Sequence, residues 1–327
     1  MTAKPIFPAI DQAMSGEIFS LSGKRVYVAG HTGMVGAAIV RRLALENCEI
    51  IKASHKELDL TRQQETESWM AREKPQVLFL AAATVGGILA NDSRPAEFLY
   101  DNLMIESNLI HAAYKTGVEK LLFLGSSCIY PREAAQPMSE EALLSGPLEP
   151  TNQWYAIAKI AGIKLTQAYR RQHGCDFISA MPTNLYGPHD TYDLNASHVI
   201  PALMAKIHAA KKSAAPEVEI WGTGKPRREF LYVDDLAEAL VFMMTHYSDD
   251  SHLNVGTGED ITIAALAAMM AGVVGFEGGF AFDSTRPDGA PRKLLDVSKL
   301  SGLGWKAKTP LEEGLKKAYE WYVENAA

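Results

Sequence analysis

KRVYVAGHTGMVGAAIVRRLALE, residues 24–46, decides the fold of this chain. It begins as an apolar run typical of a buried strand, and it ends with the apolar spacing of an amphipathic helix. Between these parts, Gly30, Gly33 and Gly36 follow the spacing GxxGxxG. The first glycine permits a tight turn, the second lets the backbone approach a pyrophosphate at the helix amino terminus, and the third allows close helix–strand contact. The stretch therefore predicts a dinucleotide-binding turn.

Strand and helix patterns alternate along the chain beyond this stretch. Residues 76–83 (QVLFLAAA), 121–128 (LLFLGSSC) and 178–188 (ISAMPTNLYGP) are apolar runs that end in small or turn-forming residues, and residues 84–117 are expected to be largely one long helix. Such alternation predicts an α/β fold with a doubly wound parallel sheet. Ligands of such sheets bind outside the carboxyl ends of the strands, so these strand ends should face one crevice.

Composition excludes several classes of protein. The chain has 327 residues and a net charge of −7, and no basic cluster indicates a nucleic-acid partner. No apolar run reaches the roughly 18 residues of a membrane helix. Residues 1–22 lack the apolar core of a secretion signal and are expected to be a tail or a short surface helix. Three cysteines without CxxC spacing favour a reduced, cytoplasmic location, and no metal site is predicted.

The second strand pattern, CEIIKASHKELDL (residues 48–60), indicates which dinucleotide binds. An NAD site has an acidic residue at the end of this strand to hold the ribose hydroxyls. The segment offers Ser54, His55 and Lys56 instead, and these groups suit a 2′-phosphate. NADP is therefore the expected cofactor, with Asp59 within reach of the adenine edge.

Residues 121–159 contain groups suited to acid–base chemistry. Tyr155 and Lys159 are four residues apart, which places both on one face of a helix. A phenol beside an ammonium can exchange protons near neutral pH, because the cation favours the phenolate and should lower the pKa of Tyr155. Ser126 or Ser127, at the end of a strand, can donate a hydrogen bond to the same oxygen. The spacing alone occurs in many helices without a function, but here a dinucleotide-binding turn precedes it.

Nine segments from about residue 24 to the carboxyl end form an ordered set. They are GHTGMVG, AAATVGGI, GSSCIYP, EPTNQWYAIAKIAG, MPTNLYGPHD, SHVIPAL, WGTGKPRREFLYVDD, NVGTG and RPDGAPRKLLDV. In this order they resemble the extended short-chain dehydrogenase/reductases and, within them, the GDP-L-fucose synthase family. The resemblance implies an NADPH-dependent enzyme that converts GDP-4-keto-6-deoxy-D-mannose to GDP-L-fucose by epimerisation at carbons 3 and 5 and hydride reduction at carbon 4. It also implies a homodimer formed through two helices, one of which carries Tyr155.

Epimerisation beside a ketone needs a base on one face of the sugar, an acid on the other, and a donor to the ketone oxygen. Ser126 and Tyr155 suit the donor role. Cys128 lies two residues after Ser126 and should face the same cleft, where a thiol with a lowered pKa is a competent base. The resemblance gives the base role to Cys128 and the acid role to His198, and it places Lys159 at the nicotinamide ribose. His189 is a competing histidine, but the turn around it indicates a structural or substrate-adjacent place.

The turn, the second strand and the resemblance together give an expected cofactor site. Its residues are Gly30, His31, Thr32, Gly33, Met34, Val35, Gly36, His55, Lys56, Asp59, Leu60, Leu124, Gly125, Ser126, Ser127, Lys159, Pro182, Thr183, Asn184, Leu185 and His198.

Substrate contacts are expected in the carboxyl-terminal half. The resemblance places Lys206, Trp221, Arg228 and Asp288 at the sugar nucleotide. A guanidinium can bind a diphosphate with two hydrogen bonds, an aromatic ring can cover a purine or ribose, and a carboxylate can bind sugar hydroxyls. Further positive charge could come from Arg227, Arg286, Arg292 and Lys293. The expected division of the chain is a tail (1–22), an NADP-binding domain (23–186 and 228–256) and a smaller, discontinuous α/β sugar-nucleotide domain (187–227 and 257–327).

Other interpretations remain open. NADP-dependent reductases or epimerases of GDP-colitose or GDP-heptose type use a similar framework, and a non-redox 4-epimerase would recycle its cofactor. His55, Thr84 and Thr191 depart from residues common in the family, and His55 stands where an arginine often holds the 2′-phosphate. A protein that only binds NADP would bind the nucleotide without turnover, which the intact serine, tyrosine and lysine set disfavours.

Overall fold

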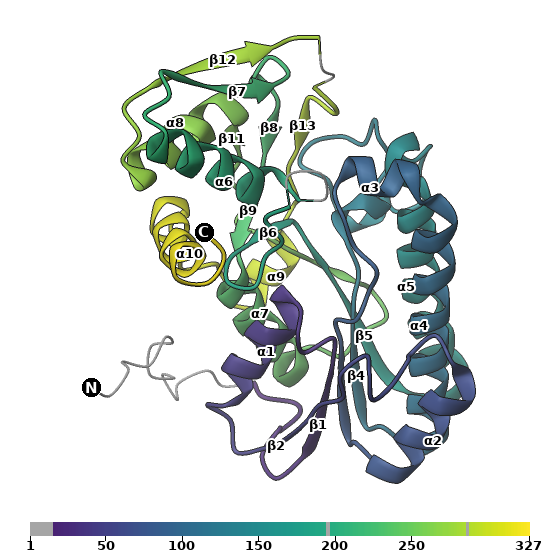
Figure 1. Cartoon of the computed structure of the whole chain (residues 1–327). Coiled ribbons are helices and arrows are strands. Elements are labelled where there is room, and N and C mark those ends of the chain that lie inside the picture. Colours follow the sequence, from purple (N-terminus) through teal and green to yellow (C-terminus); the bar gives the residue numbers. More distant parts are fainter. Residues whose placement is uncertain (1–15, 194–196, 286–287) are drawn as a thin grey trace.

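The computed structural model describes residues 16–193, 197–285 and 288–327 (Figure 1). A six-stranded sheet forms the centre of the larger part. Its strands are β1 (Arg25–Ala29), β2 (Glu49–Ile51), β3 (Val77–Leu80), β4 (Lys120–Leu124), β5 (Asp176–Pro182) and β10 (Leu253–Val255). They lie in the order β10-β5-β4-β3-β1-β2, and every neighbouring pair is parallel. The predicted doubly wound parallel sheet is confirmed.

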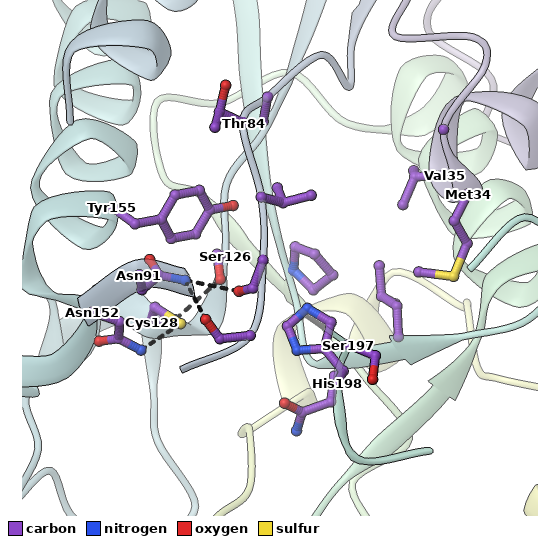
Figure 2. A pocket seen from close by; sticks show the side chains of 18 of the residues that line it. Met34, Val35, Thr84, Asn91, Ser126, Cys128, Asn152, Tyr155, Ser197 and His198 are labelled. Carbon is purple, nitrogen blue, oxygen red and sulfur yellow. Dashed lines mark hydrogen bonds between the residues drawn. The ribbon is translucent and has the colours of Figure 1, made fainter. Parts of the chain in front are cut away.

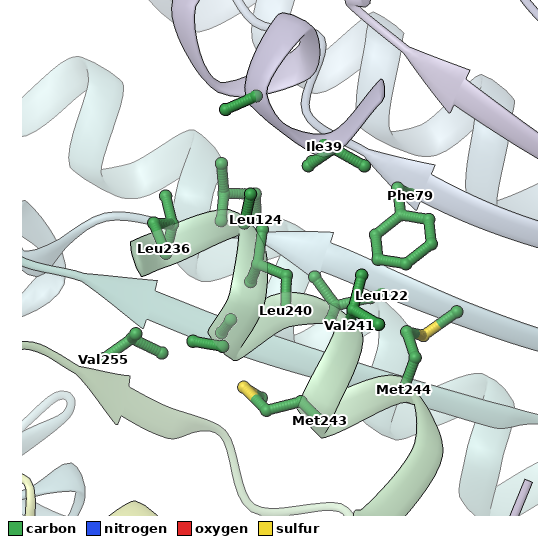
Figure 3. Packing of buried hydrophobic residues seen from close by; sticks show 14 of the residues in the cluster. Ile39, Phe79, Leu122, Leu124, Leu236, Leu240, Val241, Met243, Met244 and Val255 are labelled. Atoms are coloured by element: carbon green, nitrogen blue, oxygen red, sulfur yellow. The ribbon is translucent and has the colours of Figure 1, made fainter. Parts of the chain in front are cut away.

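Helices cover both faces of this sheet (Figure 1). One face carries α1 (Met34–Leu43) and α7 (Val233–His246), and the other carries α2 (Gln63–Glu73), α4 (Pro95–Thr116) and α5 (Gln153–His173). Successive side chains of a strand point to opposite faces. Val26 and Val28 therefore join the core layer shown in Figure 3, while Tyr27 and Ala29 join the opposite layer. Burial on both faces explains why the strands read as continuous apolar runs.

The expected long helix over residues 84–117 is instead two helices. A short helix, α3 (Ile88–Ser93), precedes α4, and Arg94 between them has the non-helical angles φ −130° and ψ 50°. Pro95 begins α4, where its missing N–H removes no helical hydrogen bond. A proline in mid-helix would have removed one, so the chain starts a new helix at this residue.

A smaller part stands beside the carboxyl ends of the central strands (Figure 1). Its helices are α6 (Val199–Lys212), α8 (Ile263–Val274) and α10 (Leu311–Asn325), and its core includes Ile207, Met270 and Leu315. The remaining strands are β6 (Asn184–Tyr186), β7 (Glu217–Trp221), β8 (Arg227–Arg228), β9 (Phe230–Tyr232), β11 (Ile261–Thr262), β12 (Gly279–Asp283) and β13 (Arg292–Lys293). The remaining helices are α9 (Ser298–Gly302) and the short 3-10 turns η1 (Ser127–Ile129), η2 (Glu140–Ala142) and η3 (Pro150–Asn152).

Glu229 joins chain segments that are far apart in the sequence. Its side chain is fully buried between β8 and β9. One carboxylate oxygen accepts hydrogen bonds from the backbone N–H groups of Thr257 (2.7 Å) and Gly258 (2.8 Å), and the other accepts one from Leu295 (2.9 Å). Burial raises the pKa of Glu229, and these three donors oppose that shift. The contacts fix the backbone next to Arg228, a predicted substrate contact.

Part of the expected tail belongs to the core. The N–H groups of Ile18 and Phe19 both donate to the carbonyl of Thr245, at the end of α7. Leu21 is 2% exposed and packs into the layer under α7. Residues 1–15 lie outside the described residues. None of the described helices is both long and apolar enough to cross a membrane.

Candidate active site

One continuous cavity of about 1660 Å³ opens at the carboxyl ends of the central strands. Gly30 follows β1, Ala81 follows β3, Gly125 follows β4, and Pro182 ends β5, and all four line it. The expected shared crevice is thus present, at the edge where parallel α/β sheets bind their ligands. The cavity continues to side chains of α6 and β7 in the smaller part.

The structure brings nearly all the predicted site residues together. Of the residues expected at the cofactor, the substrate or the chemistry, only Ser54 and Lys56 do not line this cavity, and Lys56 is exposed. His55 does line it, although this residue is also exposed. The Ser54 hydroxyl donates instead to Glu57, at 2.7 Å. Sequence reasoning pointed to this loop but could not tell which of its side chains line the cavity.

The glycine turn leaves no room for side chains. Gly30 has φ +84°, and a Cβ at this residue would lie 2.8 Å from the backbone of Ala82. A Cβ at Gly36 would lie 2.0 Å from the carbonyl oxygen of Gly30. The turn therefore presents bare backbone at the start of α1, which fits the pyrophosphate of a dinucleotide. His31 lies beside it, and burial lowers the pKa of its imidazole.

Replacing Gly36 with alanine is expected to open this turn. The added methyl overlaps the Gly30 carbonyl, so α1 must move away from the strand. We expect a loss of about 1–3 kcal/mol in the free energy of unfolding, and a rise in the NADPH Kd of about tenfold or more. Urea denaturation and fluorescence titration measure the two effects. Gly272→Ala is the matched control, because Gly272 is an exposed residue of α8 with nothing within 4 Å of its Cβ position. Unchanged NADPH affinity in Gly36→Ala would contradict the assigned turn.

Tyr155 and Ser126 lie together at the end of β4 (Figure 2). The pKa of Tyr155 is raised, first by burial and then by the negative charges of Cys128 and Glu106, while a hydrogen bond with Ser126 opposes the shift. The net shift is therefore opposite in direction to the lowering that was expected from Lys159. A raised pKa keeps the phenol protonated, which suits a proton donor.

Lys159 is paired with a buried carboxylate, that of Glu106. The Lys159 ammonium lies 2.9 Å from a carboxylate oxygen of Glu106, and both side chains are 2% exposed. Burial raises the pKa of Glu106, and Lys159 opposes that shift. Sequence analysis did not identify Glu106, because α4 and α5 are about fifty positions apart in the chain and only their packing brings the pair together.

Cys128 also has a partner that sequence analysis did not identify. Its thiol is half-buried in η1, and the side-chain amide of Asn152 donates to its sulfur at 3.2 Å. Ser126 Oγ accepts a hydrogen bond from the Cys128 N–H at 3.3 Å, which fixes the turn that carries the thiol. Asn152 lies three residues before Tyr155 in the segment EPTNQWYAIAKIAG. Its position just before a helix was the sequence signal that could have identified it.

His198 approaches the cavity from the smaller part. It immediately precedes α6, and Figure 2 shows it across the cavity from Cys128. His198 is an exposed residue, yet desolvation by the surrounding protein lowers the pKa of its imidazole. His189 does not line the cavity and packs against Trp321, with ring centroids 5.1 Å apart. The structural interpretation of His189 therefore fits its environment.

The far end of the cavity holds the expected substrate contacts. The Lys206 ammonium lies 5.0 Å from the centre of the half-exposed Trp221 ring. Arg228 lines the cavity beside Asp288, but the Asp288 carboxylate already accepts hydrogen bonds from the N–H and hydroxyl of Thr223, both at 2.7 Å. Asp288 can therefore shape the wall of the cavity as well as bind hydroxyls.

The additional positive charges are only partly directed at the cavity. Arg227 and Arg292 both pair with the buried Asp260 carboxylate, Arg227 at 2.6 Å. Their guanidinium groups are thus engaged in an ion-pair network at the β8–β13 edge. Lys293 lines the cavity, and Arg286 lies outside the described residues.

Comparisons with known proteins agree with this geometry. A model of the NAD dependent epimerase/dehydratase family matches residues 26–256. A GDP-L-fucose synthase of Sinorhizobium fredii (strain NBRC 101917 / NGR234) is 59% identical over 310 residues, which are 95% of this chain and 99% of that protein. A GDP-L-colitose synthase of Yersinia pseudotuberculosis is 38% identical, over 91% of this chain and 98% of that protein. A solved GDP-L-fucose synthetase from Naegleria fowleri bound to NADP superposes with a TM-score of 0.89 at 29% identity, covering 97% of this chain and 98% of that one. The similarity therefore extends over nearly the whole chain, including the cavity.

Proposed function

The chain belongs to the NAD dependent epimerase/dehydratase family and, within it, to the GDP-L-fucose synthases, and on this premise we propose that it converts GDP-4-keto-6-deoxy-D-mannose to GDP-L-fucose with consumption of NADPH. The observation that carries the proposal is the joining of the glycine turn, Cys128, Tyr155 and His198 in one cavity. A sugar placed there has a thiol and an imidazole on different sides and a phenol available for its ketone oxygen.

The residues divide the proton transfers among them. Ser126 and Tyr155 donate hydrogen bonds to the ketone oxygen and stabilise the negative charge that develops when an adjacent carbon loses its proton. Cys128, as thiolate, takes that proton, and His198, as imidazolium, returns one to the other face. Bound NADPH supplies the hydride for carbon 4. Tyr155 then gives its proton to the oxygen, and its raised pKa ensures that the proton is present.

The sugar nucleotide is proposed to lie along Lys206, Trp221 and Arg228. Arg228 and Lys206 can neutralise the diphosphate, and Trp221 can cover the base or ribose. We keep the division in which residues 23–186 and 228–256 bind NADPH and residues 187–227 and 257–327 bind the substrate, with Arg228 reaching the substrate from the boundary between them. The support is that cavity-lining residues come from both sets, with the glycine turn at one end and β7 at the other.

We further propose a cytoplasmic homodimer. Large apolar side chains are exposed on the two outer helices, Tyr100 on α4 and Trp154 and Ile157 on α5. An exposed apolar group of this kind is typical of an interface. The three cysteines are free thiols, as expected in a reducing compartment.

The test is turnover of GDP-4-keto-6-deoxy-D-mannose in D₂O. Loss of NADPH absorbance, deuterium at carbons 3 and 5 and an L-fucose product by NMR are expected. Oxidation of NADPH without deuterium incorporation would indicate a plain 4-reductase and would remove the roles given to Cys128 and His198. A GDP-colitose-type substrate is the second candidate, but the 38% identity to such a synthase is well below the 59% to the fucose synthase.

The pH dependence of epimerisation should reveal His198. Desolvation lowers its pKa, so its acid form disappears at a lower pH than the usual value of about 6.5. The rate of deuterium incorporation should therefore fall as pH rises through that lowered value. The measurement is a pH profile of exchange by NMR for the wild type and His198→Gln. A falling limb that persists in the variant would exclude His198 as the acid.

A further inference from the structure

Asn152 occupies a helix-capping position without capping the helix. It is the residue before α5, with φ −134° and ψ 15°, and its side chain makes no hydrogen bond to the first amides of α5. Asparagine is favoured at this position because its side-chain oxygen accepts from those amides. Here the Oδ1 atom is buried and has no partner among the described residues, while Nδ2 donates to the sulfur of Cys128 at 3.2 Å. The side chain is therefore directed at the thiol rather than at the helix.

We infer that Asn152 is a positioning residue that holds the Cys128 sulfur in its anionic form and directs it into the cavity. This inference rests on the proposed function, in which Cys128 is the base. An N–H donor stabilises an anionic sulfur more strongly than a neutral thiol, which already carries its own proton. The start of α5 adds the positive end of a 21-residue helix on the same side.

Asn91, a second asparagine that lines the cavity, makes a different kind of contact. It is 6% exposed, and its Nδ2 atom donates to the carbonyl oxygens of Gly86 and Gly87 (Figure 2). That amide fixes a loop of backbone. The side-chain amide of Asn152 instead donates to the Cys128 sulfur, a group proposed to do chemistry.

Charged groups approach Cys128 from the larger part and from the smaller part. Tyr155 on α5 is coupled to the thiol directly, since the Cys128 charge raises the pKa of the phenol. Glu149 lines the same cavity and lies 3.6 Å from Arg132, so its charge is partly offset. The Lys159–Glu106 pair is internally neutralised, and His198 faces the thiol across the cavity. Holding the sulfur anionic therefore also keeps Tyr155 protonated. The Asn152–Cys128 hydrogen bond thus supports both the proposed base, Cys128, and the proposed proton donor to the ketone oxygen, Tyr155.

The experiment measures the ionisation of Cys128 directly. In a Cys48→Ser, Cys175→Ser chain, the rate of alkylation by iodoacetamide is followed against pH, with circular dichroism and NADPH affinity as checks on folding. Asn152→Ala should move the alkylation midpoint upward by about one pH unit. Asn152→Asp should move it further, because a carboxylate repels the thiolate. Deuterium exchange into substrate at neutral pH should fall about tenfold in Asn152→Ala and recover at higher pH.

Asn152→Asp separates this role from helix capping. Aspartate caps helices as well as asparagine does, so a capping role predicts an unchanged midpoint in that variant. Gln153→Ala, which removes a neighbouring side chain that donates to the Pro150 carbonyl, is the matched control and should leave the midpoint unchanged. An unshifted midpoint in both Asn152 variants overturns the inference.

The two readouts also separate this inference from the proposed function. Alkylation requires no substrate. If the alkylation midpoint shifts in the Asn152 variants but the wild type exchanges no deuterium into the GDP sugar, the positioning role of Asn152 is supported and the proposed reaction is rejected. If the Asn152 variants exchange deuterium at the wild-type rate and their alkylation midpoint is unshifted, the proposed reaction is supported and the positioning role of Asn152 is rejected.

Discussion

Replacing Cys128 with alanine is expected to slow deuterium incorporation at carbons 3 and 5 by about 10²–10⁴-fold, the usual contribution of a positioned base. The thiol lines the cavity beside Ser126 and Tyr155, and its removal takes away the group proposed to accept the proton on that face. The glycine turn is untouched, so NADPH should bind with unchanged affinity. NMR of the substrate in D₂O and fluorescence titration with NADPH measure the two quantities.

The other two cysteines provide the control. Cys48 and Cys175 are half-buried and lie outside the cavity, and burial raises the pKa of both thiols. Alanine at either position should leave exchange unchanged. Exchange at the wild-type rate in Cys128→Ala would place the base elsewhere and would also remove the reason for the Asn152 contact.

Replacing Glu106 with alanine is expected to lower the free energy of unfolding by about 3–5 kcal/mol. Lys159 is 1% exposed, and Glu106 is the carboxylate that lies 2.9 Å from its ammonium. Removing one partner of a buried pair leaves the other charge without compensation, which is the main source of such large losses. Urea denaturation at neutral pH measures the change.

Two variants sharpen the interpretation of Glu106. Glu106→Gln keeps the shape and an acceptor, so it should lose less stability, and it should lower the pKa of Tyr155 because the Glu106 charge helps to raise it. Glu312→Ala breaks an exposed pair with Lys316 and should change stability by less than about 0.5 kcal/mol. A Glu106→Ala protein within 1 kcal/mol of the wild type would show that Lys159 finds another partner or water.

Much of the site could be predicted from local patterns. The glycine spacing, the small residues after each strand and the Tyr155–Lys159 spacing are properties of short segments, and the carboxyl ends of parallel strands meet at one edge. Lys56 illustrates the limit within one such segment. In the loop after β2, His55 lines the cavity and Lys56 does not, and the Ser54–Glu57 hydrogen bonds hold the backbone of that loop.

The sequence by itself determined the alternating α/β order, the dinucleotide turn and the set of candidate acids and bases, because each depends on spacing within one strand, turn or helix. Only the tertiary structure decided their protonation. Glu106 reaches Lys159 through the packing of α4 on α5, and Asn152 reaches Cys128 through the packing of α5 on η1. Burial and neighbouring charge set pKa values, and both arise from residues that are distant in the chain. The pKa of Tyr155 was therefore expected to be lowered by its helix neighbour, and the folded protein raises it instead.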